Sequence, residues 1–231
     1  AVHCAEVKST DLLNVDLCLQ KFQKLKSRIV LRGDLQQIED KTSVKSPTIQ
    51  RSSLNTMLAL NKIIKGDIYS VDIPAAFLFA DLNEEIFMSL NREMSELLIE
   101  ENSSLIKYAD KSGKLIVKLR KSIYGLRQAP INFYKLMRNV LTEIGFTPTV
   151  TDACIFSMRK GSEITMVAIH VDDLLVSSNS TKHVNLLKRK LSEKYGELSW
   201  NQREFTYLGM FLKRNDDYSV TLDMTAYSLN I

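Results

Sequence analysis

Apolar residues recur with two different spacings along this chain, and each spacing predicts one type of element. A spacing of three to four residues, typical of a helix with one apolar face, occurs in three segments. In the second segment Pro130 lies in the first turn and Gly145 follows the end, which are favoured positions for these residues. The expected helices span residues 51–64, 129–144 and 181–195.

Alternating or short continuous apolar runs predict strands. Pro74 stops the first strong run, and Asp172 with Asp173 interrupts the most apolar one. The turn at 159–161 makes a hairpin with these two acids at its tip. The expected strands span 67–73, 85–90, 114–119, 153–158, 163–171, 174–177 and 205–213, and 91–110 is expected to be an inserted helix and loop. This order predicts an α+β fold, with an antiparallel sheet and helices on one face.

Composition excludes several classes of protein. The 231 residues are 45% apolar and 25% charged, as in an ordinary soluble globular protein. No apolar run is long enough to span a membrane, and the first residues lack the layout of a secretory signal. Cys4, Cys18 and Cys154 are too scattered for a disulfide framework or a zinc site, which indicates reduced thiols in an intracellular protein. With three histidines in the chain, carboxylates must carry any metal chemistry.

Charge is unevenly distributed, although the net charge of +4 is mild. Nine Lys and Arg residues stand between Lys107 and Arg138, against one acid, Asp110. The stretch from Asp81 to Glu101 has seven carboxylates and one Arg. These blocks are either two solvated faces or, for the basic one, a wall that binds nucleic-acid phosphates.

Three aspartates are placed where carboxylates are costly. Asp172 and Asp173 are adjacent and repel each other between two apolar strands, and Asp72 ends another apolar strand. A solvated turn is the ordinary explanation for an Asp-Asp pair. Three carboxylates meeting at strand ends would instead form an oxygen-only site suited to Mg²⁺. Two such ions about 4 Å apart are a standard device for nucleotidyl transfer.

Several sequence blocks resemble copia-type retrotransposon reverse transcriptases. They are VDIPAAFLFADLNEEIFMSL (71–90), KLRKSIYGLRQAPINFYKLM (118–137), DACIFSMRKGSEITMVAIHVDDLLVSS (152–178) and TYLGMFLKR (206–214). KSRIVLRGDLQ (26–36) and SPTIQRSSLNTMLAL (46–60) are similar to the same family at lower specificity. The blocks occur in the family's order from Lys26 to Arg214, and this ordered set is what makes the resemblance specific.

The resemblance implies a right-hand polymerase fold and RNA-directed DNA synthesis. It implies Mg²⁺, with Mn²⁺ as the alternative ion, and a primed RNA or DNA template with deoxynucleoside triphosphates. It also implies membership of a larger polyprotein with integrase and ribonuclease H domains. The expected location is cytoplasmic, in a virus-like particle with access to the nucleus, and no membrane is involved. Residues 51–90 and 123–215 would form the palm, 1–50 and 91–122 partial fingers, and 216–231 the start of a thumb.

The resemblance also implies a role for each matching residue. The metal carboxylates would be Asp72, Asp172 and Asp173, with the Ile73 carbonyl near the second metal. Phe77 falls at the family's steric gate against ribonucleotides, or is a core aromatic. Nucleotide contacts are implied for Gln128, Arg28 and Lys26. Primer or template contacts are implied for Tyr207, Leu208, Gly209, Met210, Lys118, Arg120, Lys121 and Arg127, the first four as a primer grip or simply a strand with a bulge.

Some positions depart from the family pattern. His170 stands where many relatives carry Tyr, and Pro74 replaces a small or basic residue beside Asp72. The expected Trp-bearing finger strand before Lys26 is not visible, the thumb is expected to be largely absent, and no ribonuclease H domain is expected within these residues. The alternative function is therefore an inactive remnant that keeps the palm fold and nucleic-acid binding. Another palm-type enzyme, such as a cyclase, would not need the YGLRQAP block.

Overall fold

A computed structural model describes residues 4–8, 29–36 and 44–225. The chain forms two compact units: residues 1–45 with 77–132, and residues 46–76 with 133–231. We call them the first and the second unit. Residues 77–90, assigned to the palm from the sequence, belong to the first unit, because β4 (Asp81–Ser89) pairs with strands of that unit. In the described part of the chain, no helix is long and apolar enough to cross a membrane.

The first unit is built on a four-stranded sheet. Between β4 and the last strand of this sheet, α2 (Arg92–Glu101) and the 3₁₀ segment η3 (Ser103–Tyr108) form the helix and loop expected over 91–110. The Asn91 side chain caps α2 by accepting a hydrogen bond from the Met94 N–H at 2.9 Å. The strand order is β2 (Val30–Leu31), β1 (Cys4–Lys8), β4 and β5 (Ile116–Lys121), with 3₁₀ segments η1 (Gly33–Leu35) and η2 (Ala76–Phe79) nearby in sequence.

The second unit contains a six-stranded sheet in which every neighbouring pair is antiparallel. Sequence and structure agree on its central strands to within one or two residues. The strand order is β10 (Ser199–Gln202), β3 (Asp67–Asp72), β9 (Asp173–Ser178), β8 (Glu163–His170), β7 (Ile155–Lys160) and β6 (Thr147–Pro148). The predicted α+β class is confirmed.

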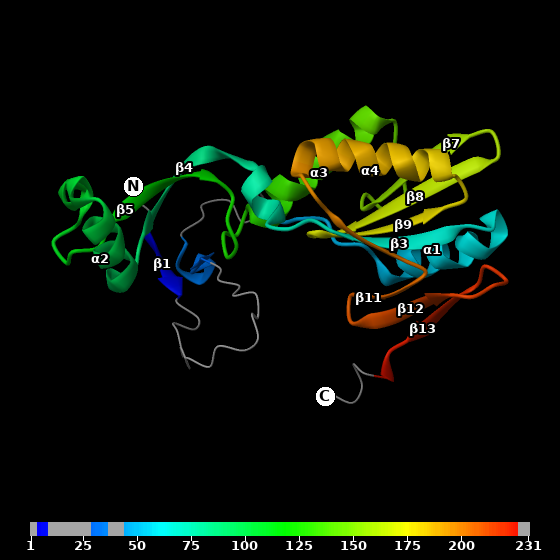
Figure 1. The fold of residues 1–231 in the computed structure, drawn as a ribbon, viewed down its shortest axis with the longest axis horizontal. Coiled ribbons are helices and arrows are strands. Elements are labelled where there is room, and N and C mark those ends of the chain that lie inside the picture. Colours follow the sequence, from blue (N-terminus) through cyan, green and yellow to red (C-terminus); the bar gives the residue numbers. More distant parts are fainter. Residues whose placement is uncertain (1–3, 9–28, 37–43, 226–231) are drawn as a thin grey trace. The chain divides into compact units, whose positions relative to one another are not determined.

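Different elements cover the two faces of this sheet (Figure 1). α3 (Ala129–Ile144) and α4 (Thr181–Tyr195) lie on one face. α1 (Arg51–Ile64) lies on the other, where its apolar side packs against Ile68 and Leu175. All three helices have the predicted bounds. The expectation that the helices share one face holds for α3 and α4 and is wrong for α1, because the opposite face of the sheet is also apolar.

A second, three-stranded antiparallel sheet packs beside α1. It consists of β11 (Glu204–Tyr207), β12 (Met210–Arg214) and β13 (Val220–Asp223). The single strand predicted over 205–213 is wrong, since the chain reverses at Leu208 and Gly209. Their φ angles of 51° and 75° are the pattern of a type I′ turn, whose twist matches that of the flanking strands.

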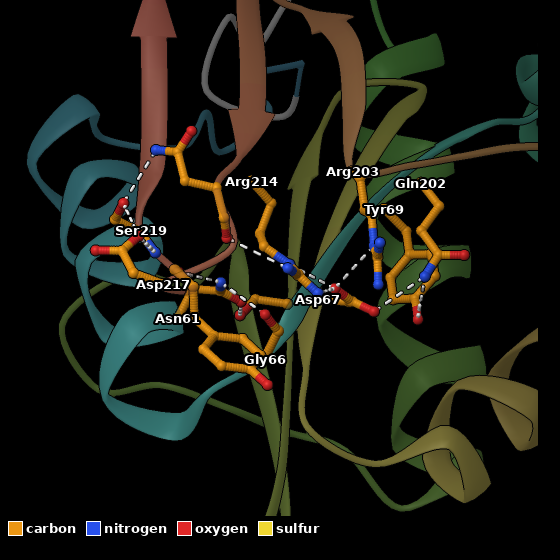
Figure 2. A network of polar contacts seen from close by, with 12 residues as sticks. Asn61, Gly66, Asp67, Tyr69, Gln202, Arg203, Arg214, Asp217 and Ser219 are labelled. Carbon is orange, nitrogen blue, oxygen red and sulfur yellow. Dashed lines mark hydrogen bonds and ion pairs between the residues drawn. The ribbon is translucent and has the colours of Figure 1, made fainter.

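Asp67, the first residue of β3, links the two sheets of the second unit (Figure 2). Arg214 of β12 donates to Asp67 from Nε at 2.6 Å and also from Nη2. Gln202 donates to the other carboxylate oxygen at 3.0 Å, and Arg203 Nε lies 3.5 Å from Asp67. The Arg214 side chain is only 7% exposed. Opposite charges joined by hydrogen bonds therefore hold the small sheet to the start of β3.

Candidate active site

The end of β3 and the start of β9 both carry an aspartate. Asp72 is the register partner of Asp173, and Asp173 is paired across β8 and β9 with His170. Directly paired residues of antiparallel strands lie on one face, with Cα atoms about 4.5–5.5 Å apart. Ile68 and Leu175 lie on that same face and belong to the core under α1 and β11–β12. The side chains of Asp72, Asp173 and His170 therefore project from the same face of the sheet that α1, β11 and β12 cover further along.

Backbone strain accompanies the acids. Val171 and Asp172 form the two-residue turn between β8 and β9, and Val171 has a φ of 56°. A β-branched residue at positive φ is an outlier, because the position suits Gly. Beyond Asp72, Ala75 has a φ of 54° directly after Pro74. Such strain is common at functional sites, and here it lies in both segments that carry the acids.

Like charges crowd this end of the sheet. The pKa of Asp173 is raised, first by burial and then by the negative charges of Asp172 and Asp72, with His170 acting in the opposite direction. Within the described ranges, neither Asp72 nor Asp173 forms an ion pair. The arrangement therefore disfavours a third negative charge and favours a bound cation.

The donor chemistry of the site fits a divalent cation. Its ligands would be carboxylate oxygens and the carbonyl of the buried Ile73. Two buried polar atoms beside the acids, His170 Nδ1 and the Tyr207 hydroxyl, have no hydrogen-bond partner among the residues that the structure describes. The same residues contain no group of three His, Cys, Asp or Glu side chains already arranged around one metal position. Strand pairing thus brings Asp72 next to Asp173. Coordination of one metal ion by all three aspartates is a prediction.

Phe77 and Gln128 are both buried in the first unit. The Phe77 ring is 6% exposed and meets Tyr124 edge to face, with centroids 4.7 Å apart. Gln128, which alone would be expected at a surface, is 5% exposed and accepts from Gln36 at 2.8 Å. Its amide nitrogen donates to Glu84 at 3.3 Å. Packing at Phe77 agrees with either of its predicted roles, while Gln128 is part of a buried polar network.

The basic residues expected to contact nucleic acid also lie in the first unit. Lys118 pairs with Glu85 and Lys121 with Asp81 across β4 and β5, the second pair at 2.5 Å. Arg127 donates from Nε to the carbonyl of Gly33 at 2.5 Å and from a terminal nitrogen to that of Asp34 at 3.1 Å. Arg120 is exposed. The acidic and basic blocks of the sequence are therefore partly neutralised by each other.

The four residues predicted as a primer grip divide into two kinds. Tyr207 and Met210 are buried in the core beneath the turn. Leu208 is half-buried and Gly209 exposed, so only the turn itself is open to a ligand. Lys26 and Arg28 lie outside the described residues.

The sequence analysis missed β10, whose Ser199 is the register partner of Asp72. Four residues are too few to show an alternating pattern. The single Trp of the chain, Trp200, was the available signal, since aromatic residues are enriched in strands. Its ring lies edge to face with Tyr69 of β3, with centroids 6.2 Å apart.

Asp72 and Asp173 thus lie paired at the ends of neighbouring strands of an α+β sheet, the arrangement expected from the sequence for a divalent-cation site. Residues 16–231 match the family described as reverse transcriptase (RNA-dependent DNA polymerase), and the chain belongs to this family.

Relatives place the chain more narrowly. It is 28% identical over 207 residues to the retrovirus-related Pol polyprotein from transposon RE1 of Arabidopsis thaliana, covering 89% of this chain and 13% of that protein. The Pol polyprotein from transposon TNT 1-94 of Nicotiana tabacum is 28% identical over 76% of this chain and 12% of its own length. The Ty1-DR5 Gag-Pol polyprotein of Saccharomyces cerevisiae is 28% identical over 81% and 10%. The predicted copia-type resemblance is confirmed.

The chain thus spans about an eighth of the length of the RE1 polyprotein. Among solved structures, an apo telomerase from Candida tropicalis shows a distant likeness. It has a TM-score of 0.42 and 12% identity, and the match covers 76% of this chain and 40% of the telomerase chain.

Proposed function

We propose that this domain catalyses RNA-directed DNA synthesis, transferring deoxynucleotides to the 3′ end of a primer. Its membership of the reverse transcriptase family supports this activity. The observation that carries the proposal is the pairing of Asp72 with Asp173 at strand ends, next to a strained turn that holds Asp172. Three carboxylates at such a place suit a site for two divalent cations.

In this proposal Asp72, Asp172 and Asp173 hold Mg²⁺, or Mn²⁺, with the Ile73 carbonyl as a further oxygen ligand. Bound cations would activate the primer 3′-hydroxyl and neutralise charge on the departing pyrophosphate. The protein's own contribution is to hold the carboxylates close together before any ligand arrives. The pKa of Asp173 is raised first by burial and then by the charges of Asp172 and Asp72, and a bound cation would offset that repulsion.

The substrate contacts belong to the proposal as well. Phe77 would exclude the ribose 2′-hydroxyl by steric conflict, with its ring held by packing against Tyr124. Gln128 would reach the nucleotide only if its hydrogen bond to Glu84 opened. Arg28 and Lys26 would bind the triphosphate. Lys118, Arg120, Lys121 and Arg127 would contact the primer or template, and Leu208 and Gly209 would approach the primer end.

The relatives are Pol polyproteins. We infer that this domain acts within such a polyprotein, beside integrase and ribonuclease H domains, on a primed RNA or DNA template. The proposed setting is a virus-like particle in the cytoplasm with access to the nucleus.

A primer-extension assay on poly(rA)·oligo(dT) tests the proposal, first with Mg²⁺ and then with Mn²⁺. Wild type should extend the primer, and Asp173→Asn should not, since one cation ligand becomes neutral. Asp217→Asn is the matched control, because Asp217 is an exposed carboxylate paired with Lys62.

Two outcomes count against the activity. Extension that survives Asp173→Asn would show that the acids are not the catalytic site. No extension by wild type, with primer–template still bound, would favour the inactive remnant that keeps the fold.

A further inference from the structure

Tyr207 has a buried hydroxyl that its surroundings do not explain. The residue is 3% exposed, and its hydroxyl has no hydrogen-bond partner in the described part of the chain. Buried polar groups are nearly always hydrogen-bonded, because leaving one unpaired loses its interaction with water without replacement. A phenylalanine would fill the same apolar core without this cost. The hydroxyl therefore indicates a hydrogen bond that the ligand-free protein does not form.

The fold places this hydroxyl on the side of the sheet that carries the acids. Tyr207 ends β11 immediately before the Leu208–Gly209 turn. Its ring lies in one core cluster with Ala168 and Leu175. Leu175 is two residues along β9 from Asp173, so the Leu175 and Asp173 side chains project from the same face of the sheet. Tyr207 packs on this face.

Electrostatics identifies the nearby groups. Burial raises the pKa of Tyr207, and the negative charge of Asp173 raises it further. Burial raises the pKa of the Cys154 thiol to about 12, so this group keeps its proton and is at most a weak acceptor. A tyrosine hydroxyl has one proton to donate, and a carboxylate is the strongest acceptor for it. Asp173 is therefore the partner that fits.

We propose that Tyr207 is a positioning residue whose hydroxyl donates a hydrogen bond to the Asp173 carboxylate when the acids hold a divalent cation. This inference rests on the proposed function. It replaces the primer contact expected for Tyr207, whose side chain is not accessible to a primer; the exposed turn keeps that role. The β11–β12 hairpin thereby supports the site from inside the core, and its tip remains at the surface.

Mn²⁺ binding measured by isothermal titration and by electron paramagnetic resonance tests the proposal in the whole domain. Tyr207→Phe should weaken Mn²⁺ binding by about tenfold or more, the usual effect of removing the hydrogen-bond partner of a metal ligand. Its thermal midpoint in EDTA should be equal to or above that of wild type, because the unpaired hydroxyl is gone. A residue needed only for packing would leave Mn²⁺ affinity unchanged.

Tyr195→Phe is the matched control. Tyr195 is also buried, but it lies in α4 on the opposite face of the sheet, and its pKa is raised by burial and by Glu143. Its variant should bind Mn²⁺ like wild type.

The outcomes separate this inference from the proposed function. If Asp173→Asn loses Mn²⁺ binding and Tyr207→Phe does not, the positioning role is overturned while the metal site stands. If Asp173→Asn binds as well as wild type, the metal site fails and the positioning role fails with it. A large fall in the EDTA midpoint of Tyr207→Phe would show that the hydroxyl is already bonded without metal, which also overturns the inference.

Discussion

The two ends of strand β3 carry the same residue type in opposite electrostatic situations. Asp67 at the start accepts from Arg214 and Gln202 and lies near Arg203 (Figure 2). Asp72 at the other end lies beside Asp173, whose pKa is raised by burial and by its acidic neighbours. One carboxylate is neutralised by cations of the protein, while the other is crowded by further carboxylates.

This difference separates a structural acid from a candidate functional one. A carboxylate that already pairs with cations of the protein has no free oxygen lone pairs for a ligand. Its role is to connect secondary-structure elements. A crowd of carboxylates is unfavourable until a cation from solution joins it, which is the pattern of sites built for chemistry. Glu85 in the β4–β5 hairpin resembles Asp67, because it too pairs with a cation of the protein. The hydrogen bond and charge of Lys118 lower the pKa of Glu85. The predictions below test the contrast, beginning with the largest effect.

Neutralising an acid at the site end of β3 should abolish activity and leave the fold intact. Asp72→Asn is expected to lower the primer-extension rate by about 10³-fold or more, since a bound cation stabilises the transition state by several kcal/mol. Circular dichroism should show unchanged secondary structure. A variant that keeps a tenth of wild-type activity would contradict the assignment of Asp72 as a metal ligand.

Neutralising the acid at the other end should affect stability. Asp67→Asn leaves the nearly buried Arg214 without its counter-charge, so the free energy of unfolding should fall by about 3 kcal/mol in urea titrations. Combining Asp67→Leu with Arg214→Leu should cost less than the sum of the two single changes, because the pair is lost together. Additive losses would mean that the pair is not coupled.

The raised pKa of Asp173 makes a signed prediction for stability against pH. The folded state holds this proton more tightly than the unfolded chain, whose value is about 3.9. Stability should therefore fall as pH rises from that value through the raised folded pKa. At pH 7 in EDTA, Asp173→Asn should therefore melt a few °C above wild type, because its neutral amide does not repel Asp72 and Asp172. The gap should close near pH 3.

Divalent cations should reverse this ranking. Adding Mg²⁺ should raise the melting temperature of wild type, because a ligand that binds only the folded state stabilises it, and it should not raise that of Asp173→Asn. A variant already less stable than wild type at pH 7 without metal would show that Asp173 is not crowded.

The smallest effect is expected at Asp217, an exposed acid beside the Asp67 network. A hydrogen bond from Lys62 is the first cause of its lowered pKa, so its contribution is present above about pH 4 and is lost as pH falls. Asp217→Asn should lower the melting temperature by about 1 °C at neutral pH. The difference should vanish at pH 2 and in about 1 M salt, which screens exposed pairs. A salt-resistant loss would place Asp217 with Asp67 as a structural acid.

Local patterns were sufficient for much of the fold. The bounds of α1, α3 and α4 follow from helical periodicity together with Pro130 and Gly145, all of which act within a few residues. The strand over 205–213 was wrong because Leu208 adopts a positive φ that its residue type does not suggest. The short β10 was missed because it exists only through its pairing with β3.

Some residues of the candidate site could also be recognised from local sequence, whereas others depend on tertiary packing. Asp72, Asp172 and Asp173 were recognised from acids that interrupt apolar strands, a signal present in the sequence itself. The relation of Tyr207 to Asp173 was not, since Tyr207 looked like one more residue of a strand that contacts the primer. Its burial and unpaired hydroxyl depend on how β11 packs against the larger sheet.

The sequence by itself determined that β3 would be an apolar strand with an aspartate at each end, because its short apolar run and the stop at Pro74 are local. Only the tertiary structure decided what each aspartate does. Antiparallel pairing placed Asp173 opposite Asp72, and packing of the small sheet brought Arg214 to Asp67 from 147 residues away. Electrostatic energy depends on distance in space. Asp67 therefore forms a structural ion pair at one end of β3, and Asp72 is a candidate metal ligand at the other.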